Sequence, residues 1–309
     1  MNDEFAIPDV HADAAALRSM LNVLPEEPRV VFLGDIVNKG PSSLEAMELL
    51  REASSVGEWT LLWGNHDLLF VRAVLGSLDA QLKLFTQGGG TALFDELGHP
   101  QFGDEVARIF KAAHATTSPL DSLRRESRFL SDIQEILSGS QQLSELIDWM
   151  IGCFQLYYLS AHKILYVHAG IPVTSEGEAR FNLDDLNTLD RQVSSELKKR
   201  DIDTSTFEML DVPEASPLRV IKWVNMIADP SRFCEQLGVR AIVVGHSEVS
   251  PDTMQNDRFP IVRHDFGAAR CKGDRPSVLQ IDENQRFITH VRIDGTWKKI
   301  ERGALRPAL

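Results

Sequence analysis

Five apolar segments of the chain end in side chains that could bind a metal ion. The clearest is the run at residues 59–63, which is followed at once by Gly64-Asn65-His66-Asp67 and then by a helical pattern. In open α/β sheets, ligands bind at the carboxyl ends of the strands. We therefore expect the polar groups that follow these segments to meet at one edge of one sheet. They are Asp9 and His11, Asp35, Asn65 and His66, His168, and His246.

Each of these residues alone also has a purely structural explanation. A single histidine after an apolar strand is more often a buried residue than a metal ligand. Asn65 or Asp67 could simply cap the helix that follows them. The recurrence of such residues after five apolar segments favours a metal centre, because a cluster of imidazole, carboxylate and amide groups is costly to desolvate without a bound cation. Mixed imidazole and carboxylate ligation suits manganese, iron or zinc better than magnesium or calcium.

The elements that must position these residues are expected to be alternating strands and helices, as in parallel βαβ units. Strands are expected at residues 5–7, 29–33, 59–63, 163–167 and 241–244. Helices are expected after the first three strands, with Ser42 or Ser43 capping the second helix. Asp9 and His11, two residues apart in an extended segment, are expected to point to the same side.

The rest of the chain has a different pattern. Amphipathic patterns predict helices at residues 106–113, 120–137 and 143–154. We expect these helices to form an insert or cap at about residues 95–158, packed on the sheet instead of folding independently. Residues 219–227 are expected to be helical, and residues 259–295 alternate as closing antiparallel strands do.

Composition excludes several classes of protein. The chain has 309 residues and a formal net charge of −13, which argues against broad, non-specific binding to nucleic acid. Phosphate-bearing substrates stay compatible with this charge, because bound divalent cations change its local sign. No apolar run approaches the ~20 residues of a membrane helix, and the first eight residues lack the basic start of a signal peptide. We expect a cytoplasmic protein with no membrane partner.

The set of motifs resembles the calcineurin-like metallophosphoesterases and, within them, the phosphoprotein phosphatase superfamily. In chain order the motifs are Asp9-x-His11, Gly34-Asp35, Gly64-Asn65-His66-Asp67, His168-Ala169-Gly170 and Gly245-His246. The loop from Gly34 to Pro41 is similar to the ApaH-like branch, relatives of bacterial symmetrical diadenosine tetraphosphatase. In that branch a neutral residue and Lys, here Asn38 and Lys39, replace the usual Asp-Arg pair. The resemblance implies an α/β fold with a central β-sandwich flanked by helices, in a single domain spanning 1–309.

The resemblance also implies a centre with two divalent metal ions, manganese first, with iron, zinc or cobalt as alternatives. One ion would be held by Asp9, His11 and Asp35. The other would be held by Asp35, Asn65, His168 and His246, with Asp35 bridging. Such a pair of cations binds phosphate and a shared hydroxide that attacks phosphorus in line.

The remaining site residues follow from the same resemblance. The catalytic set would comprise His66 as general acid for the departing oxygen, together with Asp67 and Asn38. The substrate phosphate would be bound by Lys39, Asn65 and Arg219, with Lys222 as a further candidate.

Several functions stay open from the sequence. The leading one is hydrolysis of phosphoanhydrides such as dinucleoside polyphosphates, RNA caps or polyphosphate. Asn38 motivates it, because an amide stabilises a protonated His66 less than a carboxylate does, and phosphate is a good leaving group. The alternative is a phosphatase acting on phosphoserine, phosphothreonine or phosphotyrosine. The substrate would then be a phosphoprotein instead of a nucleotide or another phosphorylated small molecule.

Two weaker alternatives complete the set. A catalytically inactive binding module is suggested by departures from the usual motifs at Pro8, Ala12, Asn38 and Lys39. A nuclease of the same fold usually has a second histidine two residues after the last Gly-His, and here that position is Glu248. The oligomeric state has no signal in the sequence.

Overall fold

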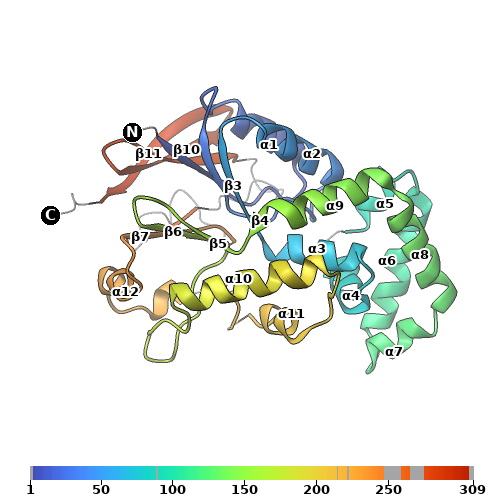
Figure 1. The fold of residues 1–309 in the computed structure, drawn as a ribbon. Helices are drawn as coiled ribbons and strands as arrows, with labels where there is room; N and C mark the ends of the chain where they lie inside the picture. Colours follow the sequence, from blue (N-terminus) through green and yellow to red (C-terminus); the bar gives the residue numbers. More distant parts are fainter. Residues whose placement is uncertain are drawn as a thin grey trace.

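Two β-sheets packed face to face form the centre of the molecule (Figure 1). The structure is a computed structural model that describes residues 3–87, 90–213, 215–220, 223–246, 259–264 and 275–305. The larger sheet contains β1 (Glu4–Ile7), β2 (Arg29–Phe32), β3 (Glu58–Leu62), β4 (Phe154–Gln155), β9 (Ser277–Ile281), β10 (Arg286–Ile293) and β11 (Thr296–Ala304). The smaller sheet contains β5 (Tyr157–Leu159), β6 (Ile164–Val167), β7 (Ala241–Val244) and β8 (Ile261–Arg263).

Strand direction changes along each sheet. Within the described residues, the larger sheet has the order β11-β10-β9-β1-β2-β3-β4 and the smaller has the order β5-β6-β7-β8. Strands β1 to β4 run parallel, as do β6 to β8, whereas β9, β10 and β11 pair antiparallel. The expected parallel strands near the site and antiparallel strands toward the C-terminus are therefore confirmed.

Alternation along the strands builds the sandwich. In β1, Ala6 packs in the cluster between the sheets, while Phe5 and Ile7 point to the opposite face and pack with helical residues. In β6, Tyr166 faces the other sheet and Leu165 faces outward. Because successive strand residues point to opposite faces, each central strand is apolar on both sides, and both outer faces need helical cover.

Helices supply that cover on both sides. Figure 1 shows α1 (Ala14–Leu21) and α2 (Ser43–Ala53) beside the larger sheet. Residues of α10 (Leu183–Lys198), the 3₁₀ helix η1 (Trp223–Met226) and α12 (Pro230–Gln236) pack in the cluster on the outer face of the smaller sheet. Helix α11 (Ser205–Leu210) instead packs in the cluster of the larger sheet and the helical region. This arrangement confirms the α/β fold with a β-sandwich flanked by helices.

A run of helices, which we call the helical region, leaves the end of β3 and gathers at one end of the molecule (Figure 1). It consists of α3 (Asn65–Val74), α4 (Leu78–Gln87), α5 (Ala92–Glu96), α6 (Pro100–His114), α7 (Pro119–Arg124), α8 (Ser127–Gly139) and α9 (Gln141–Cys153). Its buried side chains join the cluster that covers the outer face of the larger sheet. No described helix is both long and apolar enough to cross a membrane.

The structure corrects some expected elements. The helix expected at 120–137 is divided into α7 and α8, and residues 154–159 belong to β4 and β5. Two- and three-residue strands are too short to show an alternating pattern. Strand β11 lies beyond the range expected for strands, because its mostly exposed residues include successive lysines at 298 and 299. Of residues 219–227, the described helix is the short turn η1, and residues 221–222 lie outside the described part.

Candidate metal centre

The residues expected at five strand ends come from both sheets. Those after β1, β2 and β3 follow the larger sheet, whereas His168 follows β6 and His246 follows β7 in the smaller sheet. The expectation of one edge of one sheet is therefore wrong. The ligands converge because the two sheets pack face to face, with the carboxyl ends of these strands at the same end of the sandwich.

Asp9 and Asp35 are both buried and use their two oxygens differently. Oδ1 of Asp35 accepts a hydrogen bond from the backbone N–H of His66 (2.8 Å), and Oδ1 of Asp9 accepts one from the backbone N–H of His246 (3.0 Å). Oδ2 of Asp35 lies 3.7 Å from Nε2 of His11 and 3.5 Å from Nε2 of His168. Oδ2 of Asp9 lies 3.6 Å from Nε2 of His11. One oxygen of each carboxylate is thus anchored while the other faces imidazole nitrogens.

The imidazole rings are oriented by backbone carbonyl groups. Nδ1 of His168 lies 2.8 Å from the carbonyl oxygen of Leu33, and Nδ1 of His11 lies 3.4 Å from that of Val37. A carbonyl oxygen only accepts hydrogen bonds, so Nδ1 carries the proton in each ring and Nε2 keeps its lone pair. Burial is the main cause that lowers the pKa of both rings, to about 4 for His168. Both rings therefore present neutral Nε2 atoms, as metal-binding histidines do.

The chemistry of the donor atoms fits a divalent metal ion. The bare Nε2 of His168 lies 3.2 Å from Oδ1 of Asn65, so two acceptors face each other. A cation between such atoms replaces their repulsion with attraction. Each member of two groups offers an atom within 4.8 Å of the others: Asp9, Asp35, His168 and His246 in one, and His11, Asp35 and His66 in the other. Asp35 belongs to both groups, as its expected bridging position requires.

Two details differ from the expected division of the ligands. The carboxylate of Asp9, assigned with His11, also lies 3.9 Å from Nδ1 of His168 and belongs to that group. His66, expected to lie beside the metal ions without binding one, has a ring nitrogen within 4.8 Å of donor atoms of His11 and Asp35.

Several residues of the centre have a left-handed backbone conformation, which sets the direction of their side chains. His11, Asp35 and His246 have φ values of 50°, 58° and 60°. Each such residue costs about 1–3 kcal/mol and persists only where surrounding contacts fix it. The segment from Asp9 to His11 is therefore not extended as expected, because the backbone N–H of His11 turns to donate to the carbonyl oxygen of Asp35 (2.8 Å). The two side chains still meet, through a turn and not through strand alternation.

Two glycines allow the close approach of the turns. A Cβ on Gly64 would lie 2.1 Å from Oδ1 of Asp35, and a Cβ on Gly245 would lie 2.6 Å from Oδ1 of Asp9. Any side chain at either position would displace a carboxylate. The glycine that precedes Asn65 and the one that precedes His246 are therefore steric requirements of the centre.

Asp67 lies beneath the centre and is fully buried. Its Oδ2 accepts backbone N–H groups from Gly64 (2.9 Å) and Asp35 (2.7 Å), and its Oδ1 accepts that of Ile36 (2.9 Å). Burial, followed by the nearby charge of Asp35, raises the pKa of Asp67. These contacts give Asp67 a positioning role: it ties the turn after β2 to the turn after β3.

His66 is held by an amide. Nδ2 of Asn38 lies 3.2 Å from Nδ1 of His66, so the amide donates and Nε2 keeps the ring proton. The rings of His66 and His11 meet edge to face, with centroids 5.1 Å apart. Burial lowers the pKa of His66 well below its usual value, and the charge of Lys39 lowers it further. The ring is therefore neutral at pH 7, with its proton on Nε2.

Basic side chains lie on two sides of the centre. Nζ of Lys39 lies 2.6 Å from Nε2 of His11, the lone pair expected to bind metal. A metal ion on that nitrogen and the ammonium group cannot share one lone pair, so metal binding would move Lys39. Nη1 of Arg219 donates to the carbonyl oxygen of Asp211 (3.3 Å) and lies 3.7 Å from its Oδ1. The charge of Arg219 also reaches His66, whose pKa it lowers. Lys222 and Glu248 lie outside the described residues.

Comparison with known proteins assigns the family. Residues 5–249 match the calcineurin-like phosphoesterases. The chain belongs to the calcineurin-like phosphoesterase family. This match confirms the resemblance carried by the strand-end motifs, and membership implies divalent metal ions at a centre of this kind.

Curated relatives of the chain are symmetrical bis(5′-nucleosyl)-tetraphosphatases. The one from Marinomonas sp. (strain MWYL1) is 28% identical over 142 residues, which are 44% of this chain and 50% of the relative. The one from Pseudomonas putida (strain GB-1) is 27% identical over 157 residues, 48% of this chain and 54% of the relative. The chain thus spans about half the length of the curated relatives it matches. A solved structure described as a putative diadenosine tetraphosphatase covers 97% of this chain and is itself covered over 93%, with a TM-score of 0.39 and 16% identity.

Some residues that build this phosphoesterase centre carry no signal in the sequence. The carbonyl groups of Leu33 and Val37 orient two rings, and any residue type can supply a carbonyl. Asp211, which holds Arg219, lies in an acidic stretch with no motif around it. Its other partners, Arg72 at 3.1 Å and Lys83 at 2.7 Å, come from α3 and α4. Only the fold brings these groups together.

Proposed function

We propose that this phosphoesterase is a two-metal hydrolase of phosphoanhydrides, related to the ApaH-like branch of the phosphoprotein phosphatases. Its substrates would be dinucleoside polyphosphates, nucleoside-capped RNA ends or polyphosphate. The family match, the tetraphosphatase relatives and the converging ligands support this proposal. Manganese is the first expectation for both metal positions.

The metal positions follow from the donor atoms. One position would be held by His11, Asp9 and Asp35, and the other by Asp35, Asn65, His168 and His246. When bound, the metal ions supply Lewis-acid stabilisation of phosphate and a hydroxide nucleophile. The protein contributes fixed geometry, because one oxygen of Asp9 and one of Asp35 are already anchored to the backbone.

The hydrogen bond between Asn38 and His66 is the observation that carries the choice of substrate. A carboxylate at position 38 would stabilise a protonated His66, which is a strong general acid. The amide instead donates to Nδ1 and keeps the ring neutral, which leaves a weaker acid at Nε2. A weak acid serves a good leaving group such as a nucleotide or phosphate better than it serves the alkoxide of a serine. The site therefore favours anhydride bonds over phosphoserine or phosphothreonine esters.

The phosphate-binding groups would be Lys39, Asn65 and Arg219. Lys39 presents a point charge that can turn toward a bound phosphate once metal occupies Nε2 of His11. Arg219 is about one-third exposed and is held by Asp211 on the side of α11. Together they would neutralise the non-bridging oxygens that the metal ions do not reach.

A substrate panel tests this proposal directly. Purified protein loaded with manganese, cobalt or zinc is given diadenosine tetraphosphate, polyphosphate, a phosphopeptide and p-nitrophenyl phosphate side by side. We expect kcat/KM to be highest for an anhydride. A higher value for the phosphopeptide would overturn the anhydride assignment in favour of a protein phosphatase. Protein that takes up no metal ion and turns over none of the substrates would identify a binding module instead.

A further inference from the structure

The carboxylate of Glu96 reaches across from the helical region to the start of α2. Its Oε1 accepts the backbone N–H of Ser43 (2.8 Å), and its Oε2 accepts that of Leu44 (2.8 Å). Ser42 occupies the N-cap position but makes no side-chain cap hydrogen bond, so the expected serine cap is wrong. A carboxylate from α5 satisfies the free N–H groups of this helix and complements its dipole.

The same turn of α2 holds the loop that carries Asn38 and Lys39. Oγ of Ser43 accepts the backbone N–H of Asn38 (3.3 Å), and the Asn38 side chain then contacts Nδ1 of His66 (3.2 Å). Asn38 and Lys39 have φ values of 70° and 67°. Two successive left-handed residues without glycine are costly, and they persist only where neighbouring contacts hold them. Glu96 is therefore three contacts away from the proposed proton donor.

The two sides of this loop are held by different parts of the protein. On the inner side, the backbone N–H of Gly40 donates to the carbonyl oxygen of His11 (2.9 Å), and that of Ser42 donates to Ala12 (3.1 Å). Those contacts come from the metal-binding turn after β1. On the outer side, the loop leads into α2, where the backbone N–H groups of Ser43 and Leu44 donate to Glu96. The inner side belongs to the sandwich and the outer side belongs to the helical region.

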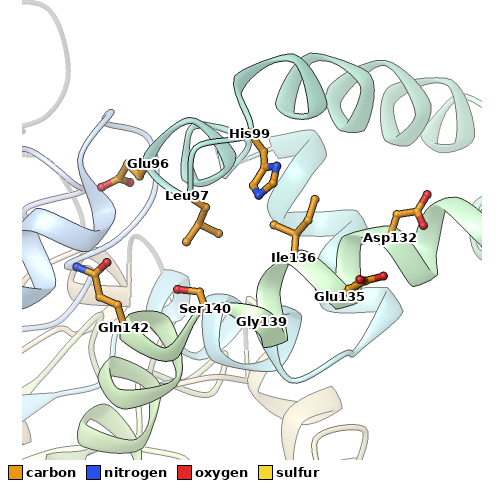
Figure 2. Close-up of a pocket in the computed structure, with 9 residues that line it drawn as sticks. All are labelled: Glu96, Leu97, His99, Asp132, Glu135, Ile136, Gly139, Ser140 and Gln142. Atoms are coloured by element: carbon orange, nitrogen blue, oxygen red, sulfur yellow. The ribbon is translucent and has the colours of Figure 1, made fainter.

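Glu96 lies at the rim of a cavity, which lets its contribution be separated from packing. The cavity has a volume of about 540 Å³ and is lined by Leu97, His99, Ile136 and Gln142, among others. Figure 2 shows the Glu96 carboxylate turned away from His99 and Ile136. The side chain is half-buried, so removal of its carboxylate deletes two hydrogen bonds without emptying a closed core.

We propose that Glu96 is a positioning residue for His66, acting through Ser43 and Asn38. This inference rests on the proposed role of His66. Its consequence is that the helical region fixes the proton donor in addition to covering the sheet. A helix cap with no further role would affect the stability of α2 and leave catalysis unchanged.

The test compares Glu96→Ala and Glu96→Gln with Glu45→Ala in manganese-loaded protein. Glu45 is a matched control, since it lies in the first turn of α2 and pairs with Arg18 (2.7 Å) instead of the loop. For phenyl phosphate, whose phenolate leaving group depends on a proton donor more than p-nitrophenolate does, we expect Glu96→Ala to lower kcat about tenfold with KM little changed, a fraction of what a general acid contributes. Glu96→Gln keeps one acceptor oxygen, so its kcat should lie between those of Glu96→Ala and the wild type. Glu45→Ala should match the wild type.

A double-mutant cycle decides whether Glu96 acts through Asn38. In an Asn38→Ala background the loss from Glu96→Ala should vanish, because the intermediary is already gone. Full retention of the loss in that background, or wild-type kcat in Glu96→Ala, would overturn the inference. If Glu96→Ala does not fold, Glu96→Gln carries the same cycle.

A second measurement is independent of turnover. Nitrogen-15 NMR of the metal-free protein should show a shifted His66 ring signal and a shifted Asn38 side-chain amide in Glu96→Gln, but not in Glu45→Ala. If the wild type hydrolyses no phosphate compound but Glu96→Gln still shows these shifts, the proposed function is refuted and the positioning contact stands. An active wild type with unchanged NMR signals would refute the contact alone.

Discussion

The floor and the rim of the centre are built in different ways. On the floor, Asp9, Asp35 and His168 are buried, come within three residues of a strand end and are anchored to neighbouring backbone groups. On the rim, Lys39 and Arg219 lie on loops and are partly exposed. The rim depends on Glu96 and Asp211, which come from segments distant in sequence. Under the proposed function, the sandwich would position the metal ions, while the surrounding helices would position the groups that hold and protonate the substrate.

The largest effect is expected from a change on the floor. Asp35→Asn removes a carboxylate that faces both His11 and His168, so both metal positions should weaken. We expect a loss in kcat/KM of about a thousandfold or more. Mass spectrometry should show a loss of bound metal, while circular dichroism stays unchanged. Asp132→Asn, at an exposed position of α8, is the control. Full turnover in Asp35→Asn would remove the bridging role.

His66→Asn is expected to lower catalysis without changing metal binding, and so to separate the role of the rim from that of the floor. The proposed acid is lost but the two carboxylates stay in place, so metal content should match the wild type. We expect kcat to fall by about 10²–10⁴-fold for phenyl phosphate, whose phenolate leaving group depends on a proton donor more than p-nitrophenolate does. Loss of metal in this variant would instead identify His66 as a ligand, which is compatible with its ring nitrogen lying within 4.8 Å of donor atoms of His11 and Asp35.

Lys39→Met is expected to raise the affinity for metal and to lower the affinity for substrate. Without the ammonium group 2.6 Å from Nε2 of His11, metal affinity measured by calorimetry should rise. KM for the phosphate substrate should also rise by about tenfold, which corresponds to one lost charge-assisted hydrogen bond. Arg219→Met should raise KM without changing metal affinity, because Arg219 contacts Asp211 instead of a proposed ligand. Unchanged metal affinity in Lys39→Met would contradict the contact.

The smallest effect is expected from Asn38→Asp. A carboxylate at this position would accept the Nδ1 proton and strengthen His66 as an acid. Turnover of phenyl phosphate should improve by about two- to fivefold more than turnover of diadenosine tetraphosphate, since the poorer phenolate leaving group depends more on its proton donor. Equal changes for both substrates would contradict the leaving-group argument.

This division between floor and rim also explains what the sequence could predict. Asp35, Asn65 and His168 follow apolar strands, so the pattern of strand then polar residue located them without a structure. That pattern could not show that His168 comes from a second sheet, because face-to-face packing of sheets has no short-range signature.

The residues that support the rim could not be predicted from the sequence, for a physical reason. Glu96 and Asp211 are ordinary acidic residues whose partners lie far away along the chain. The left-handed turn at His11 likewise depends on the hydrogen bond from its backbone N–H to the carbonyl oxygen of Asp35. Every residue type carries a backbone carbonyl, so the sequence gives no sign of this bond.

Anomalous X-ray diffraction from crystals grown with manganese would locate the metal ions and their ligands. We expect two anomalous peaks, one on either side of the Asp35 carboxylate. His11 and Asp9 should bind one ion, and His168, His246 and Asn65 the other. A single peak, or a pair that does not share Asp35, would contradict this assignment.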